Sequence, residues 1–325
     1  MQRRAFITLC AGAAVARPLT ARAQQAAMPV VGFVNVASRQ GYERPLTAFL
    51  KGLSETGYVD GKNVVIEYRW AEGRVDRLPA MVDDLVHHGV AVIAATSTPA
   101  ALAAKAVTAT IPIVFEMGGD PIRLGLVPSL NRPGGNVTGV TQLNVEVAPK
   151  RLELLHELLP TATVMALLVN PTNPSLANSA DLQAAAQNLG LQLQILNAST
   201  EREFDGVFAT VRRSHAGGLV VGPDPYLNSE ADKIAALATS FGVPTIHERV
   251  EFVAAGGLMS YGGDIAESYR LAGIYTGRIL KGEKPADLPV QQATKVELRI
   301  NLKAAKALGI TFPLSLLGRA DEVIE

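Results

Sequence analysis

Short apolar runs alternate along most of the chain with segments in which apolar residues recur every three or four positions. The runs have the length of strands, and the recurrence, clear at Leu78, Met81, Val82, Leu85 and Val86, indicates a helix with one buried face. In the first half, the expected strands are 30–36, 64–68, 90–95 and 111–115, and the expected helices are 46–55, 78–87 and 100–107. This alternation predicts a parallel sheet with helices on both faces.

The alternation is interrupted near residues 131–141 and then begins again. A turn rich in proline and glycine at 132–136 leads into a short strand at 137–141. The second series has expected helices at 150–159, 179–189, 204–213 and 230–241, and expected strands at 164–169, 191–196, 218–222 and 243–246. The remaining elements are a crossing strand at 257–261, a helix at 266–280, short strands at 288–290 and 296–300, and a helix at 302–308.

The two series predict an α/β protein with two Rossmann-like lobes, each built on a parallel sheet. We assign residues 24–141 and 258–293 to lobe 1, and residues 142–257 and 294–325 to lobe 2. Since the tail supplies elements to both lobes, we expect several chain crossings between them. Ligands of open parallel sheets bind at the carboxyl ends of the strands, which places the predicted ligand cleft between the lobes.

Residues 1–23 have the features of a signal peptide. Arg3 and Arg4 precede a mildly apolar run at 5–16, and Ala21-Arg22-Ala23 has the small-residue pattern of a cleavage site. The run is shorter than the roughly 20 residues that span a bilayer, so we expect cleavage and a mature protein that is not embedded in the membrane. The paired arginines also fit a twin-arginine signal, and both export routes remain open. Either route predicts a periplasmic protein.

Composition and motifs argue against several functions. Four of the 30 basic residues and none of the 30 acidic residues lie in 1–23, so the mature chain has a net charge of −4, which argues against a nucleic-acid partner. The one cysteine, Cys10, also lies there, which leaves no thiolate ligand or cysteine nucleophile. The phosphate-loop, dinucleotide, zinc-protease and serine-hydrolase motifs are missing from the sequence. We therefore expect no catalytic residue, no metal and no cofactor.

Four strand-to-helix joints share one pattern, in which a capping residue is followed by proline and a helix. They are Ser97-Thr98-Pro99, Gly119-Asp120-Pro121, Thr172-Asn173-Pro174 and Pro223-Asp224-Pro225. Free N–H groups at a helix start favour an anion, and the capping side chains add acceptors. Any one joint needs a cap for structural reasons alone. The set of four, two in each predicted lobe, predicts a cleft for a small polar solute.

Longer motifs are spread over the whole mature chain. They include the segments at 61–64, 68–73, 111–115, 132–139, 150–155, 256–262 and 301–309. Together they resemble a bacterial family of ABC transporter substrate-binding proteins, the group that includes tryptophan- and tyrosine-type amino-acid binding proteins. The resemblance implies a type I periplasmic-binding fold and delivery of solute to a permease with its own ATPase. Many relatives have other residues at Gly263-Asp264 and at Pro225, so the resemblance does not fix the ligand.

By this resemblance and the position of the strand ends, the expected ligand contacts are Ser38, Ser97, Thr98, Gly119, Asp120, Asn173, Asp224 and, near the hinge, Tyr261. Ser97 and Thr98 would hold a carboxylate, and Asp224 or Asp120 an ammonium group. The expected function is the periplasmic solute-binding component of an ABC importer, a monomer that binds an amino acid or a related carboxylate. The alternative that remains open is a periplasmic sensor that presents its solute to a receptor kinase.

Overall fold

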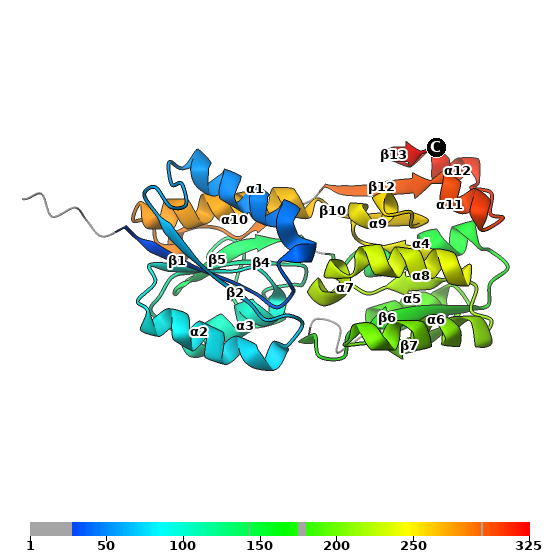
Figure 1. The fold of residues 1–325 in the computed structure, drawn as a ribbon, viewed down its shortest axis with the longest axis horizontal. Helices are drawn as coiled ribbons and strands as arrows, with labels where there is room; N and C mark the ends of the chain where they lie inside the picture. Colours follow the sequence, from blue (N-terminus) through cyan, green and yellow to red (C-terminus); the bar gives the residue numbers. More distant parts are fainter. Residues whose placement is uncertain (1–27, 143, 175–179, 294) are drawn as a thin grey trace, which may run out of the picture.

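A computed structural model describes residues 28–142, 144–174, 180–293 and 295–325. They form two lobes side by side along the long axis of the molecule (Figure 1). The predicted signal peptide, residues 1–23, and the predicted start of a helix at residue 179 lie outside the described residues. Within the described residues, most expected elements are present, with bounds that differ from prediction by at most three positions.

The first lobe is built on a six-stranded sheet with the order β11-β5-β4-β3-β1-β2, in which every pair is parallel. Its strands are β1 (Val30–Asn35), β2 (Val65–Trp70), β3 (Val92–Ala95), β4 (Ile113–Met117), β5 (Val137–Thr141) and β11 (Gln291–Gln292). Its helices are α1 (Glu43–Glu55), α2 (Leu78–His87), α3 (Thr98–Val107) and α10 (Ile265–Leu280). The inner strands β3 and β4 are fully buried because helices cover both faces, as their continuous apolar runs predict.

The second lobe has a seven-stranded sheet with the order β13-β12-β10-β9-β8-β6-β7. Its strands are β6 (Val164–Val169), β7 (Gln192–Asn197), β8 (Leu219–Val221), β9 (Thr245–His247), β10 (Met259–Gly263), β12 (Val296–Asn301) and β13 (Glu322–Ile324). Its helices are α4 (Ala148–Leu158), α5 (Ala180–Asn188), α6 (Phe204–Arg213), α7 (Pro225–Ser229), α8 (Ala231–Phe241), α9 (Val250–Ala254), α11 (Leu302–Ala307) and α12 (Leu314–Leu317). The expected parallel pairing holds in this sheet except at one pair, since β12 runs antiparallel to β10.

Helix α10 joins the first lobe although it is distant in sequence from the rest of it. In Figure 1 it lies beside α1, the orange helix next to the blue one. Glycines allow this close approach: a Cβ atom on Gly52 would lie 1.9 Å from the carbonyl oxygen of Arg270, and one on Gly273 would lie 2.1 Å from that of Phe49. The two backbones therefore touch, and α10 is an integral layer of lobe 1.

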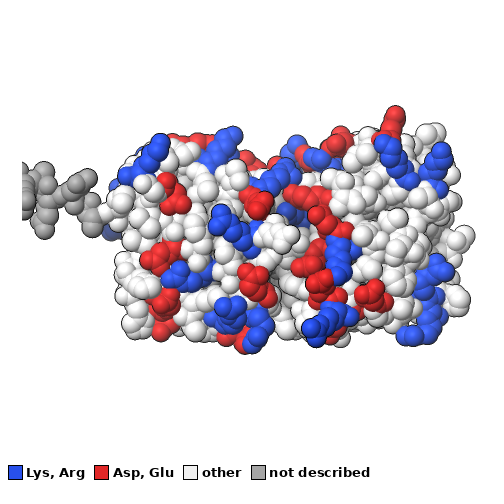
Figure 2. Space-filling view, viewed as in Figure 1, with Lys and Arg blue, Asp and Glu red and all other residues white. Residues whose placement is uncertain are grey.

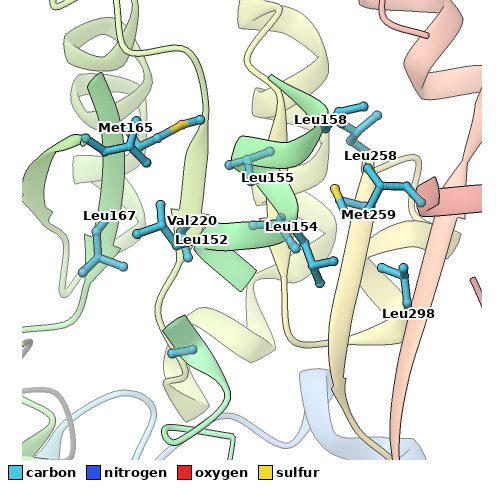
Figure 3. Close-up of a cluster of buried hydrophobic side chains, with 14 of the residues drawn as sticks. Leu152, Leu154, Leu155, Leu158, Met165, Leu167, Val220, Leu258, Met259 and Leu298 are labelled. Carbon is cyan, nitrogen blue, oxygen red and sulfur yellow. The ribbon is translucent and has the colours of Figure 1, made fainter. Parts of the chain in front are cut away.

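The second lobe has a continuous apolar core between its sheet and α4. Figure 3 shows Leu152, Leu155 and Leu158 of α4 facing Met165 and Leu167 of β6 on one side and Met259 of β10 on the other. All of these side chains are buried. Burial of a leucine side chain contributes roughly 1.5–3 kcal/mol, so this cluster fixes α4 against both halves of the sheet. It makes β10 and β12 part of the same rigid lobe as β6.

The chain passes between the two sheets after β5, after β10 and after β11. Our boundary at residue 258 needs correction, because β10 pairs with β9 and β12 of the second sheet, and the crossing comes after Gly263. Two crossings are tied together: the N–H of Gly263 donates to Oδ1 of Asn144 at 3.0 Å. The buried guanidinium of Arg151 donates to the carbonyl oxygens of Asn144 and Tyr261. Arg151 thus joins α4 to the segment where the lobes meet.

Candidate ligand-binding site

A cavity lies between the lobes where the carboxyl ends of β3 and β4 face those of β8 and β9. The space between its walls, open solvent included, is about 400 Å³, and the part in which the centre of a water molecule fits is about 30 Å³, so the walls lie close together. The side of lobe 1 contributes Tyr42, Thr96, Ser97, Thr98, Glu116, Met117, Gly118 and Ile265. The crossing and lobe 2 contribute Gln142, Asn144, Val145, Asn173, Pro223, Asp224, Pro225, Asn228 and Glu248. The predicted location of the cleft agrees with this cavity.

The first-lobe wall begins at the amino end of α3. Ser97 is the N-cap of this helix, and its Oγ accepts the N–H of Ala100 at 3.4 Å and the N–H of Val36 at 3.3 Å. A hydroxyl has one hydrogen besides its acceptor sites, so Ser97 can still donate to a ligand. Thr98 is the next residue and also lines the cavity. Both residues stand where a negatively charged ligand group would meet donors and the positive end of a helix dipole.

Asp224 faces Ser97 from the second lobe, but its carboxylate is already occupied. It caps α7 by accepting the N–H of Leu227 at 2.9 Å, and it accepts the side-chain amides of Asn173 at 2.8 Å and Asn170 at 3.2 Å. Burial raises the pKa of Asp224, and these three donors act in the opposite direction. Asp224 thus holds the second-lobe joint together, with Asn173 as its partner.

Two buried glutamates, one from each lobe, line the cavity, and the sequence analysis identified neither of them. Glu116 lies on β4 and Glu248 directly follows β9, and their side chains are 2% and 4% exposed. Burial raises the pKa of Glu116 to about 8, although the side-chain amide of Gln142, which donates to Oε1, acts to lower it. Burial also raises the pKa of Glu248. The sequence did contain one signal, a charged residue within the apolar segment at 113–117. Burial of a charge is costly unless a partner compensates it, so such a residue is a candidate for a binding site.

Glu248 is only half satisfied by hydrogen bonds. Its Oε1 accepts the side-chain amide of Asn228 at 2.5 Å. Its Oε2, and Oδ1 of Asn228, have no hydrogen-bond partner among the described residues. An unpartnered buried acceptor costs free energy, roughly 1–3 kcal/mol. The second-lobe wall therefore presents two acceptors that a donor could satisfy.

A contact between charged and aromatic groups spans the opening beside the cavity. The guanidinium of Arg249, in lobe 2, lies over the ring of Tyr42, in lobe 1, at 5.5 Å. Nε of Arg249 also pairs with Oε2 of Glu251 at 2.9 Å, and Oε1 of Glu251 accepts from Arg44 of lobe 1 at 3.0 Å. These contacts connect α1 and α9 and hold the lobes in their present relation.

Four of the eight predicted ligand contacts line the cavity, namely Ser97, Thr98, Asn173 and Asp224. Gly119 and Asp120 line a neighbouring groove instead, where Oδ1 of Asp120 caps the following turn through the N–H of Ile122 at 2.8 Å. Ser38 follows β1 outside the lining of both. Tyr261 lies on β10, two residues before the crossing after Gly263, and its side chain packs against the second-lobe core without lining the cavity.

Two other residues that the sequence brought forward have structural positions. Burial lowers the pKa of His247 to about 3, so its ring is neutral and stacks on Phe252 at 5.2 Å between centroids. Trp70 packs against Phe33 at 5.3 Å in the first-lobe core. Within the described residues, we find no group of three or more histidine, cysteine or acidic residues arranged to hold a metal ion. No helix in the described part of the chain has the length and hydropathy of a membrane span.

Charge on the molecular surface is mixed. On the face drawn in Figure 2, lysine and arginine side chains are interspersed with aspartate and glutamate over both lobes. Exposed ion pairs on the surface of the protein include Arg278 with Glu283 and Arg74 with Asp76. A broad field of one sign would favour a polyanionic or polycationic partner, and this face offers neither.

Comparisons with known proteins agree with the fold and the cleft. The chain is 28% identical over 280 residues to a tyrosine-binding protein of Clostridioides difficile, covering 86% of this chain and 80% of that protein. It is similar to an ABC domain from Streptococcus pneumoniae in complex with L-Trp, with 29% identity, a TM-score of 0.81 and coverage of 91% and 99% of the two chains. The ligand-free, open structure of a substrate-binding protein with adhesive properties from Clostridium difficile, with 26% identity and the same coverage, has a TM-score of 0.62.

The arrangement of the lobes is therefore more similar to that of the complex with L-Trp than to the open structure. The fold is the type I periplasmic-binding fold that the motifs indicated, with its ligand cavity between two α/β lobes. Residues 30–324 match the family model described as ABC transporter substrate binding protein. Since that match spans nearly all of the described residues, the chain belongs to the ABC transporter substrate-binding protein family.

Proposed function

We propose that this protein is the periplasmic solute-binding component of an ABC importer. It binds a small polar solute, an amino acid or a related carboxylate, between its lobes and delivers it to a permease and its ATPase. It acts as a monomer, without a cofactor and without catalysing a reaction. The observation that carries this proposal is the buried polar cavity between two lobes whose strand ends face each other. The tyrosine-binding and L-Trp-bound relatives support an amino-acid ligand.

Binding would follow from closure of the lobes. Ser97, Thr98 and the amino end of α3 would receive the negative end of the solute, because they offer hydroxyl donors and the helix dipole. Asn173 and Asp224 would form the opposite wall. A solute that contacts both walls binds the closed state better than the open one and shifts the population toward it. The permease would then recognise the closed form.

Export would use residues 1–23 as a cleaved signal. The arginine pair, the apolar run and the Ala-x-Ala site support this step, by either the general or the twin-arginine route. A fusion of residues 1–30 to a reporter that is active only in the periplasm tests it. Arg3→Lys with Arg4→Lys should abolish export by the twin-arginine route and leave the general route working.

A thermal-shift screen of the chain from Gln24 onward tests solute binding. The panel contains amino acids, short carboxylates, amides, amines and sugars. A ligand at 100 times its dissociation constant stabilises the folded state by roughly 2.7 kcal/mol, which raises the melting temperature by several degrees. A hit among amino acids or carboxylates supports the proposal. Binding of sugars alone would contradict the assignment of Ser97 and Thr98, and failure of the whole panel would count against solute binding.

A further inference from the structure

The cavity between the lobes has an unbalanced set of charged side chains. Three carboxylates line it, those of Glu116, Asp224 and Glu248, and all three residues are at most 4% exposed. Among the described residues that line it, none is lysine, arginine or histidine. Charged groups are rarely buried without compensation, because removing them from water costs several kcal/mol per ion. Without a positive partner Glu116 keeps its proton at neutral pH, because burial raises its pKa to about 8, and a cation between the lobes would favour its ionised form.

The hydrogen bonds of the nearest arginines lie away from the cavity, and Nη1 of Arg249 and Nε of Arg151 have no partner among the described residues. Arg249 pairs with Glu251 and stacks on Tyr42, and it lines a separate groove at the edge of the lobes. Arg151 donates to the carbonyl oxygens of Asn144 and Tyr261 behind the cavity wall. Their fields do reach the cavity, since both arginines lower the pKa of Glu248 against the dominant effect of burial. Neither is paired with Glu116 or Glu248 within salt-bridge distance among the described residues.

The three carboxylates differ in their free capacity. Asp224 accepts three protein donors and is saturated by the joint it caps. Oε1 of Glu116 accepts from the side-chain amide of Gln142. Glu248 has an unpartnered Oε2, and the adjacent Oδ1 of Asn228 is unpartnered as well. In their ionised form Glu116 and Glu248, together with Oδ1 of Asn228, offer acceptors from both lobes, which is the chemistry that receives an ammonium group with its three N–H donors.

We propose that the solute carries a net positive charge, as an aliphatic protonated amine held between Glu116 of lobe 1 and Glu248 of lobe 2. Its ammonium donates to Oε2 of Glu248 and Oδ1 of Asn228, and Glu116 closes on it from the other side. This inference rests on the proposed solute-binding function and sets its ligand class as cationic amines: L-lysine also has the carboxylate proposed to meet Ser97 and Thr98, and a diamine does not. It also moves the ammonium site away from Asp224 and Asp120, where the sequence alone placed it.

The apolar lining fits an aliphatic chain. Met117, Val145 and Ile265 contribute apolar surface beside the carboxylates. Tyr42 is the one aromatic residue among the described residues of the lining, and its ring already faces Arg249. A ring-bearing solute would find no stacked pair of aromatic side chains here. A methylene chain between the ammonium and the Ser97 end of the cavity matches both walls.

Isothermal titration calorimetry on the chain from Gln24 onward tests the inference. The probes are diaminoalkanes of three to six carbons and L-lysine, with 1,4-butanediol as the uncharged analogue of 1,4-diaminobutane, and L-tyrosine and succinate as solutes without net positive charge. We expect a diamine or L-lysine to bind, and the diol to bind at least about tenfold more weakly than the diamine. The probe comparison uses the unaltered protein, so it holds even if a variant fails to fold.

Glutamine variants of the two glutamates test which carboxylates bind the ammonium group. Glu248→Gln keeps the shape and the Asn228 contact but removes the negative charge, so it should lower the affinity for the amine by at least about tenfold. Glu116→Gln should lower this affinity as well. Glu153→Gln, on the exposed surface of α4 where it pairs with Lys150, is the control and should leave the affinity unchanged. If L-tyrosine or succinate binds and neither L-lysine nor any diamine does, this inference is wrong and the solute-binding function is still supported. Equal binding of diol and diamine overturns it too, and no binding by any probe counts against both.

Discussion

Arg249 and Tyr42 face each other across the cleft, with the guanidinium carbon 5.5 Å from the centre of the ring. The two residues belong to different lobes, and both are less than 5% exposed. A desolvated contact of this type contributes about 0.5–2 kcal/mol. Since it exists only when the lobes are together, it favours the closed arrangement whether or not solute is present. The protein thus has a built-in bias toward closure, to which the solute adds its own contacts.

Arg249→Met should shift the ligand-free protein toward an open form. The methionine keeps much of the buried stem and loses the charge that interacts with Tyr42, and Glu251 keeps its second partner, Arg44. Small-angle X-ray scattering should then give a larger radius of gyration. Arg39→Met is the matched control, because Arg39 lies over the ring of Tyr68 at 5.6 Å within lobe 1. An unchanged radius for Arg249→Met would show that this contact does not bias closure.

Gly41→Val should weaken solute binding while the separate lobes stay folded. A Cβ atom at Gly41 would lie 2.4 Å from Cα of Ser229, on the opposite lobe, so any side chain there blocks full approach of the lobes. We expect an affinity loss of at least about tenfold by calorimetry. Gly206→Ala is the control, because a Cβ atom there meets nothing within 4 Å. Unchanged affinity in Gly41→Val would mean that closure to this distance is not needed.

The sequence was sufficient to predict the two lobes, but it predicted only part of the cavity lining. Apolar runs such as 111–115 and 164–169 predict buried strands because their period and length leave few alternatives, and the structure has β4 and β6 there, with β4 shifted by two residues. The pairing of β10 with β9 depends on contacts distant in sequence, and no local pattern at 258–263 shows which sheet it joins. For the same reason the sequence did not show that the side chain of Tyr261 packs against the core of the second lobe.

The site residues that the sequence identified have a local pattern, and those that it missed depend on contacts distant in sequence. Ser97 and Asp224 cap helices at the strand ends, a local property that proline at the next positions makes visible. Glu116 and Glu248 become neighbours of one cavity only after two lobes fold and meet, and neither has a motif of its own. Asp120 has the same local pattern as Asp224 and still faces a different groove, since the pattern fixes a cap and not its direction.

Asp224→Ala should destabilise the second lobe. The change removes the N-cap of α7, worth about 0.5–2 kcal/mol, and leaves the buried amides of Asn170 and Asn173 without this acceptor, at roughly 1–3 kcal/mol more. Urea denaturation followed by circular dichroism measures the loss. Asp224→Ser should recover the capping part, because serine also caps helices. If alanine and serine variants are both as stable as the unaltered protein, the joint does not depend on this carboxylate.

Glu116→Gln should change how stability depends on pH. The carboxyl of Glu116 has an ordinary pKa of 4.5 and a folded-state pKa of about 8, raised chiefly by burial and also by the charge of Glu248, against Gln142 and Arg249. Between these values the folded protein keeps a proton that the unfolded chain has lost. The stability contribution is therefore complete below pH 4.5, falls as pH rises through this window, and is lost above pH 8.

Glutamine does not titrate, so the variant lacks this decline. Its free energy of unfolding relative to the unaltered protein should rise with pH across the window, by about 1.4 kcal/mol for each unit by which the pKa is raised. Urea denaturation at intervals from pH 4 to 9, without solute, gives the difference directly. The other groups that act on Glu116 are Glu248, Arg249, Tyr42 and Tyr269, and they are present in both proteins. A difference that does not change with pH would mean that Glu116 is ionised in the folded protein at neutral pH, with a positive partner already beside it.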